Sequence, residues 1–178
     1  MISMSIQRLS RFMIALCWGG IIGFPIFQLW FWLFNPNSLA SLKMTSHLKN
    51  TDVSQTSEFQ ILLALVLSLG GALILSYGLF RLYRMFCEFI DGHFFTKEAI
   101  GHLHAFSFFL FVSVIYRVIQ TGLMAAVLTW HNPPGQRQMV LSLGSQELST
   151  LFVAGLLLTI TWCFREANRI DVENKEFV

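Results

Sequence analysis

The sequence has 178 residues, of which 54% are hydrophobic and only 12% are charged. Soluble globular proteins carry roughly 25% charged residues, and so few charges cannot cover the surface of a water-soluble globule of this length. The composition therefore excludes a soluble globular protein and indicates a chain that lies largely in a membrane.

The charged residues are clustered, and the gaps between them predict four membrane spans. A hydrocarbon core takes about 20 apolar residues as a helix, and the stretches that meet or approach this length are residues 12–34, 59–80, 105–130 and 148–164. The fourth is short but can extend by a turn at its outer end. We therefore predict an all-α polytopic membrane protein, a single domain over residues 1–178 with four transmembrane helices in a bundle. The second and fourth helices should extend into the cytoplasm, within a helical hairpin at 81–104 and a helical tail at 165–178.

The first span has the basic start of a signal peptide, at Arg8 and Arg11, but its apolar stretch is much longer than the roughly 7–15 residues of a signal-peptide core. We expect it to be retained. Gly19 and Gly23 form a Gly-x-x-x-Gly pattern within it, which is typical of close helix packing. Small residues in spans two and three predict the same kind of contact: Gly71, Gly78, Gly122 and Ala126. Packing inside the bundle and packing against a second copy or a foreign subunit both remain open.

Span two is predicted to continue as a helix beyond the membrane. A helix over Phe59–Asp91 would be about 50 Å long, roughly 20 Å more than the hydrocarbon thickness. Gly92 then fits the left-handed residue that ends a helix, and Thr96 fits the N-cap of the next one. Glu98 is favoured in the first turn by the helix dipole. Phe95, just before the cap, has the spacing of a hydrophobic staple.

Three histidines lie in or beside this cytoplasmic turn: His93, His102 and His104. The last two are two residues apart, so on a helix they point about 200° apart and cannot chelate one ion as a pair four residues apart does. His93 could approach one of them, but nothing in the sequence requires it. We predict no metal site and no cofactor, and regard these histidines as interfacial or solvated side chains.

Span three carries a polar stripe with a charge near its middle. Ser113, Arg117, Gln120 and Thr121 share one helical face by their spacing of three and four residues. An arginine at this depth costs about 2.5–3.5 kcal/mol on insertion scales, which makes Arg117 a candidate for a functional site. No Asp or Glu lies inside the four predicted spans, so we expect no acidic partner for Arg117 there. Two interpretations stay open: hydrogen bonds within the bundle, or a contact with an acidic partner protein, lipid or ligand.

Lysine and arginine are divided unequally between the two sides of the predicted topology. The N-terminus, the loop between spans two and three and the C-terminus together hold eight of them, whereas the two other loops hold Lys43, Lys49 and Arg137. Because basic residues are concentrated in cytoplasmic loops, both the N- and C-termini are predicted to be cytoplasmic.

The central turn also carries a family resemblance. A Gly-x-x-Phe-Thr-x-Glu turn formed by Gly92, Phe95, Thr96 and Glu98, together with the four-span layout and a tail containing Glu173 and Asn174, resembles the small bacterial membrane proteins of the YoaS-like domain-of-unknown-function family. The chain departs from that pattern in its "KEFV" ending and its long outer loop. The resemblance implies a bacterial inner-membrane protein without an assigned reaction. It also implies a regulatory role, since some relatives look like partners of small helix-turn-helix regulators.

The sequence contains no Gly-rich phosphate loop, Ser-His-Asp set, paired carboxylates or basic nucleic-acid patch. We therefore predict neither an enzyme nor a direct nucleic-acid-binding protein. Our main interpretation is a non-enzymatic regulatory or accessory membrane protein that contacts lipids and binds another membrane or cytoplasmic protein, or a second copy of itself. The alternative is a small transporter or channel subunit, or a membrane protein that binds a lipid or other ligand through Arg117.

Overall fold

The computed structural model describes residues 4–34, 58–92, 96–130 and 143–176. These residues form four long helices, which are α1 (Met4–Phe34), α3 (Glu58–Ile90), α4 (Lys97–Leu128) and α5 (Ser145–Glu176). All four contain a segment long and apolar enough to cross a membrane: Arg8–Trp32, Phe59–Ile90, Lys97–Val127 and Ser145–Ile170. The predicted all-α architecture of four membrane-spanning helices is confirmed.

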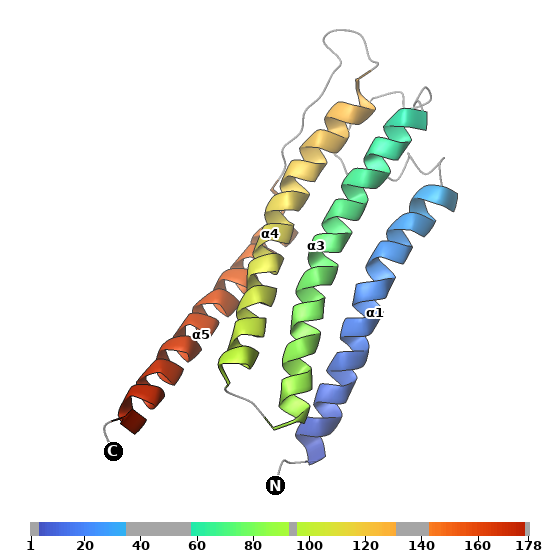
Figure 1. Cartoon of the computed structure of the whole chain (residues 1–178). Coiled ribbons are helices and arrows are strands. Elements are labelled where there is room, and N and C mark those ends of the chain that lie inside the picture. The colour runs from blue at the N-terminus through green and yellow to red at the C-terminus, as the bar shows by residue number, and fades with distance from the viewer. Residues whose placement is uncertain (1–3, 35–57, 93–95, 131–142, 177–178) are drawn as a thin grey trace.

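The helices pack in chain order, with α3 between α1 and α4, and α5 against the far side of α4 (Figure 1). Both described chain ends and the turn between α3 and α4 lie at the same end of the molecule, which we call the termini end. Helix α5 begins beside the middle of α4. It runs obliquely toward the termini end and extends beyond the first turn of α4. The tail predicted as helical belongs to α5, which continues to Glu176.

The outer surface of the helices is apolar, as a lipid environment demands. Large hydrophobic side chains stand exposed along every helix; Phe12 on α1 is 60% exposed and Phe152 on α5 is 68% exposed. The buried contacts between helices are made largely by small residues, such as Ala64 on α3 and Ala125 on α4, both fully buried. Small side chains let helix backbones approach closely where lipid supplies no hydrophobic driving force. The chain is an integral, multi-pass membrane protein.

The turn between α3 and α4 has the local chemistry predicted from the sequence. Gly92 adopts a positive φ of 89°, which a residue with a Cβ adopts only with strain. Thr96 has the extended conformation of an N-cap, and its Oγ1 accepts a hydrogen bond from the backbone N–H of Ala99 at 3.2 Å. Glu98 lies in the first turn of α4. The predicted staple residue Phe95 lies outside the described residues.

The predicted glycine contacts are found between α3 and α4 but not on α1. A Cβ on Gly71 would approach Gln120 and Tyr116 of α4, and a Cβ on Gly78 would lie 3.2 Å from the Cβ of Phe109. Gly122 is buried and Ala126 partly buried on α4.

On α1, by contrast, no atom of another described helix lies within 4 Å of the Cβ position of Gly19 or Gly23, so neither packs against the described bundle. Gly20, which the sequence analysis did not select, makes the close approach instead, because its Cβ position lies 2.7 Å from Leu79 Cδ1. Gly19 and Gly23, four residues apart, share one face of α1, and only Gly20 faces α3.

Candidate functional site: a groove between α1, α3 and α4

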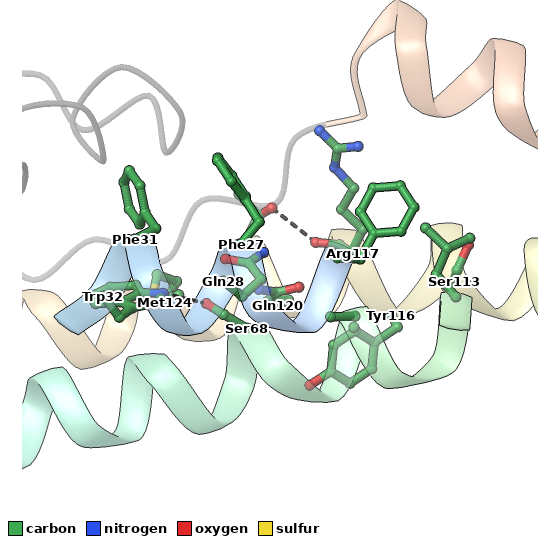
Figure 2. Close-up of a pocket in the computed structure, with 15 residues that line it drawn as sticks. Phe27, Gln28, Phe31, Trp32, Ser68, Ser113, Tyr116, Arg117, Gln120 and Met124 are labelled. Carbon is green, nitrogen blue, oxygen red and sulfur yellow. Dashed lines mark hydrogen bonds between the residues drawn. The ribbon is translucent and has the colours of Figure 1, made fainter. Parts of the chain in front are cut away.

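A groove of about 500 Å³ runs between α1 and α4, with α3 as its floor (Figure 2). Ser68, Gly71 and Ala72 form much of this floor, and these side chains are too small to fill the space between the two neighbouring helices. The floor lies in the middle of the uncharged stretch between Glu58 and Arg81. The groove is therefore at hydrocarbon depth, and its volume falls in the range of about 300–1,000 Å³ typical of ligand sites.

The two walls differ in character. Helix α1 contributes mostly aromatic side chains, Phe24, Phe27, Phe31 and Trp32, together with the amide of Gln28. Helix α4 contributes the predicted polar stripe: Ser113, Arg117, Gln120 and Thr121 all line the groove, with Tyr116 and Met124. The structure thus brings the four residues predicted from span three to one site, and adds an aromatic wall that faces them.

Hydrogen bonds from both walls to α3 hold the groove together. Trp32 Nε1 donates to Ser68 Oγ at 3.1 Å, and the same hydroxyl donates to the carbonyl oxygen of Ala64 at 2.9 Å. On the other wall, the Tyr116 hydroxyl donates to the carbonyl oxygen of Leu67 at 2.8 Å. These bonds are formed away from water, where an unmade hydrogen bond is costly, so they fix the spacing of α1 and α4 across α3.

Two of the predicted site residues are satisfied by their own helix. Ser113 Oγ donates to the carbonyl oxygen of Leu110 at 2.7 Å, and Thr121 Oγ1 donates to that of Arg117 at 2.9 Å. Hydroxyl side chains in a helix commonly bond back to the preceding turn in this way. Ser113 and Thr121 therefore contribute shape and acceptor capacity to the groove, but no free donor.

The expectation that Arg117 has no acidic partner within the bundle is wrong. Its Nε lies 3.2 Å from Oε1 of Glu147, in the first turn of α5. Glu147 directly precedes the predicted fourth span, which was drawn from Leu148, and the packing of α5 against the middle of α4 places it at the depth of Arg117. The other carboxylate oxygen, Oε2, accepts a hydrogen bond from the backbone N–H of Gly144 at 3.0 Å. Glu147 thus neutralises Arg117 and also caps its own helix.

The side chain of Arg117 lines the groove only with its stem. Figure 2 shows the guanidinium group pointing away from the other labelled residues, in the direction that the ion pair with α5 requires. The Arg117 side chain is 54% exposed, while that of Glu147 is 15% exposed. The positive charge of Arg117, predicted near the middle of span three, lies at the rim of the groove and has a partner.

Gln28 and Gln120 are the polar side chains of the groove for which the described part of the chain offers no hydrogen-bond partner. They line it from opposite walls, and neither makes a hydrogen bond with a described residue. Gln120 was predicted from the sequence as a site residue, whereas Gln28 was not. The available signal was simple, because Gln28 is the only charged or amide side chain between Phe12 and Phe34.

The described histidines near the start of α4, His102 and His104, form no comparable site. His102 Nδ1 lies 3.5 Å from Nη1 of Arg81, a cation, and His93 lies outside the described residues. Within the described parts of the chain, no group of three or more His, Cys, Asp or Glu side chains is placed to hold a metal ion. The groove is the feature of the described structure that offers a binding site.

Comparison of this chain with protein-family models, with curated proteins and with solved structures finds no match.

Proposed function

We propose that this protein is a non-enzymatic membrane protein that binds an amphiphilic molecule, a lipid or a lipid-like ligand, in the groove between α1, α3 and α4. The observation that carries the proposal is a hollow of about 500 Å³ at hydrocarbon depth, with aromatic side chains on one wall and polar groups on the other. Such a lining suits a molecule with both an acyl chain and a polar group.

Trp32 offers a direct test, because it lines the groove and is only 7% exposed. A variant that keeps Trp32 and replaces the other four tryptophans by Phe would be reconstituted in vesicles of phosphatidylcholine with brominated acyl chains, which quench indole fluorescence on contact. An acyl chain in the groove would quench Trp32, whereas lipid around the protein has little access to an indole that is 7% exposed.

Thr121→Phe should fill the groove near Trp32 and reduce this quenching several-fold, because Thr121 lines the groove one turn from Met124, which packs against Trp32. Thr159→Phe is the matched control, because Thr159 is an exposed hydroxyl on α5 that also bonds back to its own helix. Quenching that is absent from the parent variant, or equal in Thr121→Phe and Thr159→Phe, would contradict lipid binding in the groove.

A second candidate function is that of an accessory subunit, favoured by the outer face of α1. Gly19 and Gly23 are exposed there, with no atom of another described helix near their Cβ positions, and this spacing suits a further transmembrane helix. Affinity purification in mild detergent, followed by mass spectrometry, would compare wild type with Gly23→Leu. Gly155→Leu is the control, since Gly155 is also open. A stoichiometric subunit lost only in Gly23→Leu supports this role; equal recovery in all three proteins argues against it.

The transporter alternative has less support. Transporters typically bind at breaks in transmembrane helices, whereas each described helix here is continuous, including α1, which passes through Pro25. We also propose that the protein lies in a bacterial inner membrane, as the YoaS-like resemblance implies, with the termini end in the cytoplasm, as the distribution of basic residues implies. Reporter fusions at Val178 and within residues 51–56 test this orientation; periplasmic activity of the Val178 fusion would reverse it.

A further inference from the structure

We infer that the groove selects amphiphiles whose polar group is uncharged and both donates and accepts hydrogen bonds, such as an amide or hydroxyl joined to a hydrocarbon chain, and that Gln28 and Gln120 recognise it. This inference rests on the proposed function and names the ligand class for the same groove.

Most hydrogen-bond donors around the groove already have partners within the bundle. The indole of Trp32 and the hydroxyls of Ser68 and Tyr116 donate to α3, and the hydroxyls of Ser113 and Thr121 donate to α4. Each of these donors is therefore used within the bundle. A ligand that needs a donor from the protein must find it elsewhere.

The side-chain amides of Gln28 and Gln120 differ from these donors. Gln28 on α1 and Gln120 on α4 line the same groove and are partly buried, yet neither has a hydrogen-bond partner among the described residues (Figure 2). Gln120 Oε1 lies over the floor, 3.1 Å from the position that a Cβ on Gly71 would occupy. In hydrocarbon no water satisfies such groups, and leaving an amide unpaired there is unfavourable. An occupant that bonds both amides removes this cost.

The charge that a ligand can carry depends on the charged groups around the groove. Arg117 is the one charged residue among the described residues that line the groove, and its guanidinium group pairs with Glu147 and points away. The groove therefore supplies no free charge to balance an ionised head group at this depth. The complement of two glutamine amides, each with a carbonyl acceptor and an N–H donor, is an uncharged group with the same two capacities.

The aromatic wall of the groove places the hydrocarbon chain of the ligand. Phe24, Phe27 and Phe31 line the α1 side of the groove, and their rings provide apolar surface for a hydrocarbon chain next to the amides. The polar group would then lie between Gln28 and Gln120, and the chain would run along the aromatic wall.

The test uses competition against the brominated lipid in the Trp32-only variant. Dodecanamide, dodecane and dodecyl phosphate would be added, and the recovery of Trp32 fluorescence would be followed. Because two hydrogen bonds of ordinary strength amount to about a tenfold change in affinity or more, dodecanamide should act at a concentration at least about tenfold lower than either of the others.

Gln28→Met, Gln120→Met and the double variant should lower this preference to about threefold or less, and a resistance to unfolding in SDS no lower than that of the Trp32-only parent would show that the bundle is intact. Gln146→Met is the control, since Gln146 is exposed on α5 outside the groove. Quenching without a preference for dodecanamide, or a preference that survives both substitutions, overturns the inference while lipid binding stands. A preference for dodecyl phosphate would assign recognition to Arg117. Absence of quenching in the Trp32-only parent removes the proposed function and this inference with it.

Discussion

The ion pair between Arg117 and Glu147 predicts an asymmetric response to substitution. Arg117→Leu removes a charge that is expensive to insert, and leucine is favoured over arginine by about 3 kcal/mol on insertion scales. The substitution nevertheless leaves the Glu147 carboxylate, only 15% exposed, without its cation. Glu147→Gln leaves an arginine whose side chain is 54% exposed and long enough to reach a more polar depth. We therefore expect Arg117→Leu to be the more damaging change to the folded state, even though the variant inserts at least as well as wild type.

The magnitude follows from the burial of the two groups. Breaking a buried pair costs about 3–5 kcal/mol, and an exposed pair contributes about 0.2–1 kcal/mol. In this pair Glu147 is largely buried and Arg117 is more than half exposed. We therefore expect a value between these two limits, so that Arg117→Leu lowers the free energy of unfolding by about 2 kcal/mol. Glu147→Gln should lower it by about 1 kcal/mol or less, because a glutamine oxygen still accepts from the Gly144 N–H. The double variant should recover most of the loss, since replacing both charges is often neutral or stabilising.

The assay is a double-mutant cycle in mixed micelles, in which SDS unfolds the protein and helicity is followed by circular dichroism. We expect a coupling free energy of about 1–2 kcal/mol, within the usual range for residues in contact. Arg169→Leu is the control, because its pair with Glu166 is exposed on both sides and should contribute about 0.5 kcal/mol or less. The reasoning fails if Arg117→Leu is as stable as wild type and the coupling is near zero. Such a result would mean that the ion pair does not stabilise the fold, and it would favour a role for Arg117 in binding a ligand or a partner.

The same unfolding titration tests three further expectations. Thr96→Ala should lower stability by about 1 kcal/mol because it removes the cap of α4, with Thr96→Ser close to wild type; an unchanged Ala variant would mean that the cap is dispensable. Gly92→Ala should cost about 1–2 kcal/mol because of the positive φ, and a neutral effect would contradict that conformation. Gly101→Ala should raise stability by up to about 1 kcal/mol, since its Cβ position is open and Ala favours helix. Gly78→Ala should not, because Phe109 lies 3.2 Å away; equal gains at Gly78 and Gly101 would refute this packing.

The fold was predictable because its signals are local. Long stretches without charge give the number of spans, and a helix needs nothing from its neighbours to satisfy its backbone in lipid. The turn between α3 and α4 was predictable for the same reason, since Gly92 and Thr96 act on the backbone within a few residues of themselves. The order of packing was not a local property, and the sequence alone did not show that α3 lies between α1 and α4.

The partner of Arg117 was missed because a span was treated as an apolar run. Glu147 lies one residue before that run, and hydropathy assigns such a residue to the adjoining loop. In the structure α5 begins at Ser145 and packs its first turn against the middle of α4, so the carboxylate enters the depth of the arginine. The depth of a terminal charge depends on how the helices are offset, which is a tertiary property. The direction of the glycines on α1 depends on tertiary packing in the same way.

The polar residues of the groove also differ in a way that polarity alone does not reveal. A serine or threonine in a helix reaches the carbonyl of its own preceding turn, as Ser113 and Thr121 do, and so it enters a membrane with its donor already satisfied. The side chains of Gln28 and Gln120 do not bond back to their own helix, and a glutamine can instead form hydrogen bonds with a neighbouring helix. Gln60 shows the satisfied outcome, because its amide on α3 donates to the carbonyl oxygen of Val127 on α4 at 2.9 Å. Gln28 and Gln120 have the same chemistry and face a hollow instead of a carbonyl. The hydroxyls of Ser113 and Thr121 are therefore satisfied within their own helix, whereas the amides of Gln28 and Gln120 have no hydrogen-bond partner among the described residues. This difference is the basis for proposing that a ligand bonds the two amides.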